Sequence, residues 1–72
     1  MFRDGVHKTF ADHEPSARIL ETLKQGPTTA PVVAEVCGIH PSYATSLLLL
    51  AAAEGIAQIV RSEGRVTYVG AS

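Results

Sequence analysis

The sequence of 72 residues contains a single cysteine, Cys37, and no tryptophan. One cysteine cannot form an intramolecular disulfide, and it belongs to no set of residues with the spacing of a metal site. Domains of this size have little core to spare and often need a disulfide, a metal or a partner subunit. Association with a partner subunit is therefore one way in which this chain could be stabilised. Sparse cysteine is also typical of a reducing compartment, so we expect a cytoplasmic protein.

Long apolar segments are equally absent. The longest uninterrupted apolar run, residues 47–53, has seven residues, whereas about 20 are needed to span a bilayer. Residues 1–14 carry scattered charges and lack the continuous apolar stretch of a signal peptide. We expect a soluble protein with no membrane partner.

No arrangement of residues predicts catalysis. No Cys–His or Ser–His–Asp set has a spacing that would activate a nucleophile, and no glycine-rich phosphate loop is present. We therefore expect neither an enzyme nor a bound cofactor. Four potential metal ligands occur near the N-terminus without a fixed spacing, and we interpret them as not forming a metal site; they are His7, Asp12, His13 and Glu14. Cys37 itself is expected to be a small buried apolar residue.

The apolar content of 46% predicts one folded domain. Residues 1–14 show no helical period, so they are interpreted as an N-terminal arm with a short extended piece over 6–10. The domain itself is expected over 15–72. Its first helix, over 15–25, begins with Pro15 at the first helical position and ends at Gly26-Pro27.

Two further helices are predicted in the middle of the chain. The first of them follows a cap at Thr28-Thr29 and ends at Gly38. Its expected inner face comprises Val32, Val33, Val36 and Cys37. The next helix, over 41–54, starts at Pro41 and closes at Gly55. Its helical spacing places Ala44, Leu47, Leu48 and Ala51 on the core face, against Leu20, Leu23 and Val33.

After Gly55 the apolar period changes to two, which is typical of β-strands. Residues 56–61 and 66–69 form two such runs, separated by a turn over 62–65 that contains Gly64. These runs predict a terminal β-hairpin. The fold class is therefore α+β: three helices followed by a two-stranded β-hairpin.

This order of elements resembles the winged helix-turn-helix regulators of the MarR, ArsR and IclR types. The resemblance rests on "ARILETLKQGP" as the first helix, "APVVAEVCGIHPSYATSLLLLAAAEGIA" as the helix-turn-helix, and "QIVRSEGRVTYVG" as the wing. It covers about three quarters of the chain, and the segment from Gly38 to Ile56 is the most specific part.

In the resembling family the third helix enters the major groove of DNA and the wing contacts the backbone or the minor groove. Carried over by position, the resemblance implies DNA contacts at Thr28, Thr29, His40, Ser42, Tyr43, Thr45, Ser46, Arg61 and Arg65. Other roles stay open for several of them. Thr28 and Thr29 suit helix caps, Tyr43 suits a protein interface, and the two arginines suit solvated edge charges.

The sequence departs from the family in its charges. Six basic and seven acidic residues give a net charge of −1, and no Lys or Arg lies in residues 27–60. Contacts to phosphates provide most non-specific DNA affinity. The cations available for them are Arg3, Lys8, Arg18, Lys24, Arg61 and Arg65. At Ser46 the family often has an arginine.

Apolar residues also stand where the family has polar ones. Leu49 and Leu50 leave the third helix apolar nearly all round, and such a helix is normally covered on every side. The arm could cover it through Phe2 or Phe10. A homodimer contact through Leu49 and Leu50 is the alternative we favour, and a protein partner on residues 41–54 is another.

Two functions follow from these features. The first is a DNA-binding transcriptional regulator that acts by occupying its operator, as a homodimer. The second is a winged-helix module that has lost DNA binding and instead contacts a partner protein as its regulator or inhibitor. The resemblance and the wing arginines favour the first, whereas the absence of cations from the helix-turn-helix favours the second.

Overall fold

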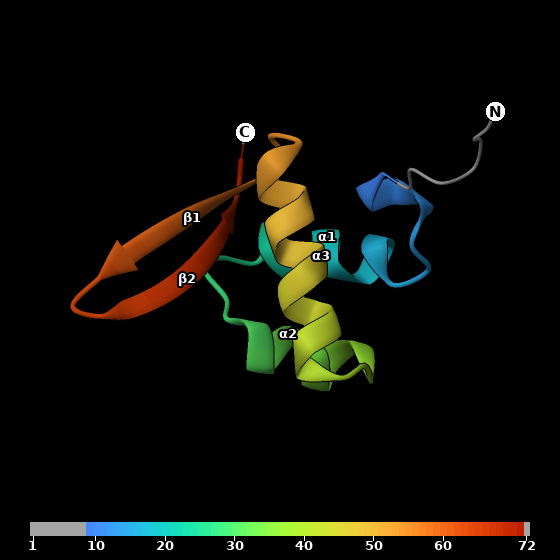
Figure 1. The fold of residues 1–72 in the computed structure, drawn as a ribbon, viewed down its shortest axis with the longest axis horizontal. Coiled ribbons are helices and arrows are strands. Elements are labelled where there is room, and N and C mark those ends of the chain that lie inside the picture. The colour runs from blue at the N-terminus through green and yellow to red at the C-terminus, as the bar shows by residue number, and fades with distance from the viewer. Residues whose placement is uncertain (1–8, 72) are drawn as a thin grey trace, which may run out of the picture.

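The computed structural model describes residues 9–71. Most of the expected extended piece over 6–10 lies outside this range. So do the residues Phe2, Arg3, His7 and Lys8. Six elements follow one another along the described chain (Figure 1): a 3₁₀ helix η1 (Phe10–Asp12), the helices α1 (Ser16–Lys24), α2 (Ala30–Cys37) and α3 (Pro41–Ala53), and the strands β1 (Ala57–Ser62) and β2 (Arg65–Gly70). This is the expected α+β layout, three helices followed by an antiparallel hairpin, and it has the arrangement of a winged helix.

The first helix is one residue shorter at each end than expected. Pro15 is its N-cap rather than its first residue, and the Pro15 carbonyl accepts the first helical hydrogen bond, from the N–H of Ile19. At the other end the chain leaves the helix at Gln25, and Gly26 follows with a φ of +127°. Only glycine adopts that φ readily, which explains why the helix ends here.

The inner face expected for α2 is partly wrong. Val33 and Ala34 are its buried residues, whereas Val32 and Val36 are both 46% exposed. Cys37 is half-buried rather than part of the buried core. Because most residues of α2 are apolar, the 3.6-residue period does not single out one face, and packing against α3 decides which side chains are buried.

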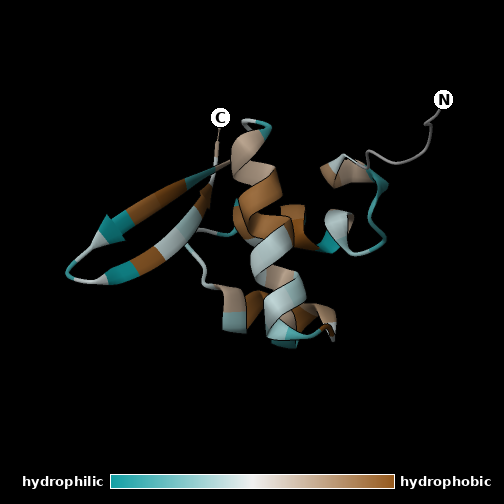
Figure 2. Cartoon of the chain, in the orientation of Figure 1, coloured by the Kyte–Doolittle hydropathy of each residue, from teal (hydrophilic) through white to brown (hydrophobic). Residues whose placement is uncertain are grey.

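The expected core face of α3 is confirmed. Ala44, Leu47, Leu48 and Ala51 are all buried, together with Leu23 and Val33 from α1 and α2, while Leu20 packs against this core partly buried. The helix begins at Pro41 and ends one residue before the expected Glu54, which is its C-cap. Figure 2 shows that α3 is mostly pale in its first half and apolar in its second half.

The hairpin extends away from the helices as a wing (Figure 1). Its loop, Glu63-Gly64, has positive φ angles of 52° and 76° at its two residues, the pattern of a two-residue turn that matches strand twist. At its base, Thr28 pairs with Tyr68 through two backbone hydrogen bonds, of 2.9 and 2.8 Å. The link between α1 and α2 thus adds a third, antiparallel segment of one residue to the sheet, beside β2.

Residues 9–14, which lie before the expected domain boundary at residue 15, contribute to the folded core. Phe10 begins η1 and is fully buried in the same cluster as Ile19, Leu47 and Leu48. A phenylalanine side chain buries a large apolar area, which the small core needs. The domain therefore includes residues before Pro15.

Among residues 9–71, no single helix is both long and apolar enough to cross a membrane. Helices α2 and α3 have the length and apolar composition of a span only when taken together, and the chain bends by 111° between them.

Candidate nucleic-acid interface

The bend between α2 and α3 creates the helix-turn-helix. Gly38 caps α2 in the left-handed conformation, with a φ of 69°, and the N–H of Ile39 bonds to the Ala34 carbonyl. Ile39 then packs against the core, and Pro41 starts α3 in a helical φ. These three residues fix the direction in which α3 leaves the turn.

One side of α3 is left uncovered by the described chain. Opposite the core face lie Ser42, Ser46, Leu49 and Ala53, spaced three or four residues apart, and all four are exposed. We call these four residues the outer face of α3. In Figure 1 the helices α1 and α2 lie behind α3. The outer face is as long as the helix itself.

Hydroxyl groups line the first half of α3, and their protons point back into the helix. The Ser46 Oγ donates to the Ser42 carbonyl and the Thr45 Oγ1 to the Pro41 carbonyl, both over 3.0 Å. A hydroxyl that donates in this way keeps its oxygen lone pairs free to accept hydrogen bonds. The surface therefore offers acceptors to an incoming donor.

The two aromatic rings expected at this site have partners within the protein. His40 is the N-cap of α3: its Nδ1 accepts from the Ser42 N–H at 3.1 Å and lies 2.8 Å from the Ser42 Oγ. The Tyr43 hydroxyl lies 3.1 Å from His13 Nδ1, and the two rings meet edge to face. Tyr43 is thus on the η1 side of α3, whereas the hairpin lies on the other side (Figure 1).

Thr28 does not occupy the position expected of a phosphate contact. It is 7% exposed, and both of its backbone groups are bonded to Tyr68. Its Oγ1 is buried without a hydrogen-bond partner among the described residues. Thr29 is the N-cap of α2 and half-buried, but its side chain makes no capping hydrogen bond. Of the two threonines, only Thr29 presents surface to a ligand.

The two wing arginines lie on opposite faces of the hairpin. Arg61 pairs with Val66, and Ser62 pairs with Arg65. Paired residues share a face and neighbours along a strand alternate. Arg61 is therefore on the same face as the buried Tyr68, and Arg65 is on the other. The register therefore places the two arginines, both expected as wing contacts, on different faces of the hairpin.

Leu49 and Leu50 differ in environment. Leu49 is 48% exposed at the middle of the outer face of α3. Leu50 is partly buried and packs against the core, on the same side of α3 as Tyr43, seven residues earlier. Of the expected interface pair, Leu49 alone presents a large exposed apolar surface.

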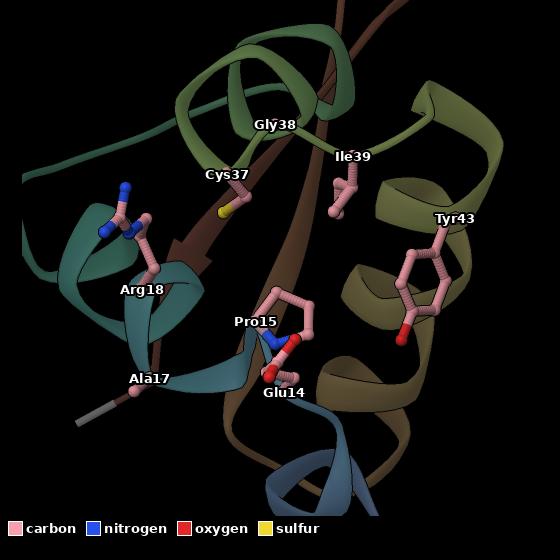
Figure 3. Close-up of a pocket in the computed structure, with 8 residues that line it drawn as sticks. All are labelled: Glu14, Pro15, Ala17, Arg18, Cys37, Gly38, Ile39 and Tyr43. Carbon is pink, nitrogen blue, oxygen red and sulfur yellow. The ribbon is translucent and has the colours of Figure 1, made fainter.

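An open pocket lies beside the helix-turn-helix, between the start of α1 and the α2–α3 turn (Figure 3). Ile39, Tyr43 and Pro15 surround its centre, and the Arg18 side chain borders it on the far side from Tyr43. Cys37 also lines it, and burial raises the pKa of this thiol while the nearby Arg18 charge opposes that shift. The thiol is therefore less ionised at neutral pH than an ordinary cysteine.

A contact that the sequence does not predict joins Glu54 to η1. The Glu54 Oε2 accepts a hydrogen bond from the Phe10 N–H at 2.9 Å. No local pattern predicts a contact between residues so far apart in the chain. The available signals were an acidic residue at the C-terminal end of a helix, where it is electrostatically unfavourable, and an isolated apolar residue in the arm.

No family model, curated protein or solved structure matches the chain.

Proposed function

We propose that this protein binds double-stranded DNA and regulates transcription by occupying its site. The observation that carries the proposal is the uncovered outer face of α3. A helix that leaves a sharp turn and exposes small hydroxyl-bearing residues at its start has the shape and the chemistry to enter a major groove. The wing beside it supplies cations for the phosphate backbone.

The lack of cations on α3 determines which bases it would contact. The commonest specific contact, an arginine or lysine on guanine, is not available to it. Hydroxyl oxygens that accept hydrogen bonds suit the amino groups of adenine and cytosine, and the Leu49 side chain suits the thymine methyl group. The proposed site is therefore rich in A·T pairs.

A charge placed on the outer face of α3 tests the proposal. Binding to a labelled duplex is measured by fluorescence anisotropy at about 50 and 200 mM salt, two conditions that separate phosphate contacts from other contacts. Ser46→Arg is expected to strengthen binding and Ser46→Glu to weaken it, with on the order of a tenfold difference or more between them. The same pair of substitutions at Gln25, exposed at the end of α1, is the control and should differ far less.

Equal effects at both positions would mean that only net charge matters, and the proposal would fail. Absence of binding to any duplex at low salt would also overturn it. It would then favour the second candidate, a module that binds a partner protein. The exposed Leu49 and the cation-free α2 and α3 are the features that support that candidate.

A further inference from the structure

The outward side of α2 is apolar at its centre. Val32 and Val36 lie four residues apart on the side opposite the buried Val33 and Ala34, and each is 46% exposed. Glu35 borders this pair on the side away from Cys37, and it is exposed as well. We call Val32, Glu35 and Val36 the outer face of α2.

Helix stability does not account for these two valines. A β-branched side chain loses rotamer freedom in a helix, so an exposed valine forms helix less well than alanine, lysine or glutamate. Two of them one turn apart on an exposed surface are better explained by a contact that removes them from water.

One acid and one base border this apolar pair. The Arg18 side chain reaches from α1 to the end of α2, where its Nη1 lies 3.4 Å from the Val36 carbonyl oxygen. Glu35 is exposed and forms no hydrogen bond or ion pair with another described residue. It also lies in the last turn of α2, where the helix dipole disfavours a negative charge. The acid is therefore available to a cation from outside the chain.

We propose that the outer face of α2 binds the same face of a second copy of this chain. A two-fold axis along α2 makes the two helices parallel and places Val32 and Val36 of each copy against the same residues of the other. Arg18 borders the valine pair on the side of Cys37 and Glu35 on the other side, so this symmetry brings Arg18 of each copy beside Glu35 of the other, within reach of both long side chains. An apolar pair with one acid and one base is complementary to itself, as a two-fold interface requires.

The contact is small and leaves α3 free. Eight helical residues extend about 12 Å, so the two faces bury much less than the about 800 Å² per partner of a stable complex. The copies associate at high concentration, or when a duplex holds two of them together. A contact through Leu49 would instead hide Ser42 and Ser46, because all three belong to the outer face of α3.

Solution NMR of the free protein tests the proposal without DNA, so its outcome is separate from that of the DNA-binding test. Amide chemical shifts of the ¹⁵N-labelled protein are followed from about 20 μM to 1 mM. Concentration-dependent shifts are expected at Val32, Glu35 and Val36 and not at Ser46 or Leu49. Shifts centred on Leu49, or no concentration dependence at all, would overturn the proposal.

A charge exchange tests the pairing. Glu35→Arg places like charges opposite each other twice in a two-fold dimer, so the association constant should fall on the order of tenfold. Arg18→Glu combined with Glu35→Arg should restore it. Leu49→Gln is the control and should leave it unchanged. Circular dichroism checks that each variant is folded. The arrangement would be refuted if Glu35→Arg left the association constant unchanged. It would also be refuted if the folded double variant did not restore the association constant.

Discussion

The backbone N–H of Phe10 donates a hydrogen bond to the side chain of Glu54, 44 residues later in the chain. Glu54 is the C-cap of α3, where its charge opposes the helix dipole. The bond to η1 gives that charge a partner and holds Phe10 over the core. Part of what covers the apolar third helix is therefore its own N-terminal segment, one of the alternatives that the sequence left open.

Removing this bond should destabilise the domain, because it joins η1, which carries the buried Phe10, to the end of α3. Glu54→Ala is expected to lower the free energy of unfolding by about 1.5 kcal/mol, the lower end of the range for a hydrogen bond to a charged group, because Glu54 is exposed. Urea denaturation followed by circular dichroism measures it. Glu54→Gln retains an oxygen acceptor and should lose less. If Glu35→Ala, at an exposed acid without a partner, costs as much as Glu54→Ala, the hydrogen bond is not the cause.

Removal of the Thr28 hydroxyl should stabilise the domain. Its Oγ1 is buried without a partner among the described residues, and an unsatisfied buried polar group costs about 1–3 kcal/mol. Thr28→Val keeps the shape of the side chain, so we expect the free energy of unfolding to rise by about 1 kcal/mol. Thr29→Val, at the neighbouring half-buried cap, should bring no such gain. Weaker DNA binding by Thr28→Val would show that the hydroxyl serves a ligand after all.

Because Arg61 and Arg65 lie on opposite faces of the hairpin, replacing them should have unequal effects on DNA binding. A duplex that lies against one face of the wing contacts only one of them. Arg61→Ala and Arg65→Ala are measured by the dependence of DNA affinity on salt. Loss of one phosphate contact reduces the slope by about one, and we expect this for one variant and not for the other. Equal reductions would mean that DNA contacts both faces of the hairpin.

The sequence predicted the elements and most of the core because those depend on local patterns. Leu47, Leu48 and their neighbours follow the helical period in a helix whose other side begins with serines, so the core face was identifiable. In α2 valines occur on both sides, and the period could not say that Val33 is buried and Val32 exposed. The choice is made by the packing of α2 against α3, which the sequence of α2 does not contain.

The candidate site was predicted as a set of residues but not as a surface. Ser42 and Ser46, expected as DNA contacts, lie opposite the core face that the helical period predicted, and both are exposed. The orientation of Arg61 relative to Arg65 depends on the two-residue loop, which sets the register and with it the face of each side chain. The partner of Tyr43 is His13, 30 residues away, and no local pattern indicates it.

Leu49 provides the sharpest test of how α3 contacts DNA. It is 48% exposed between Ser46 and Ala53 on the outer face of α3, and in a major groove its side chain would meet thymine methyl groups. Once a preferred duplex is known, replacing its thymines one at a time by deoxyuridine removes single methyl groups and leaves base pairing unchanged. We expect one or two of these positions to weaken binding severalfold, since burial of a methyl group contributes about 0.8 kcal/mol.

The Leu49→Ala variant shows whether the leucine is responsible. If Leu49 contacts the methyl group, this variant binds the original duplex more weakly and no longer distinguishes thymine from deoxyuridine at those positions. Leu50→Ala cannot serve as the control, because Leu50 packs against the core; Val60→Ala, at an exposed position on the wing, can, and it should keep the full discrimination. A Leu49→Ala protein that still prefers thymine would show that the methyl group contacts another residue, and α3 would then enter the groove with a different side facing the bases.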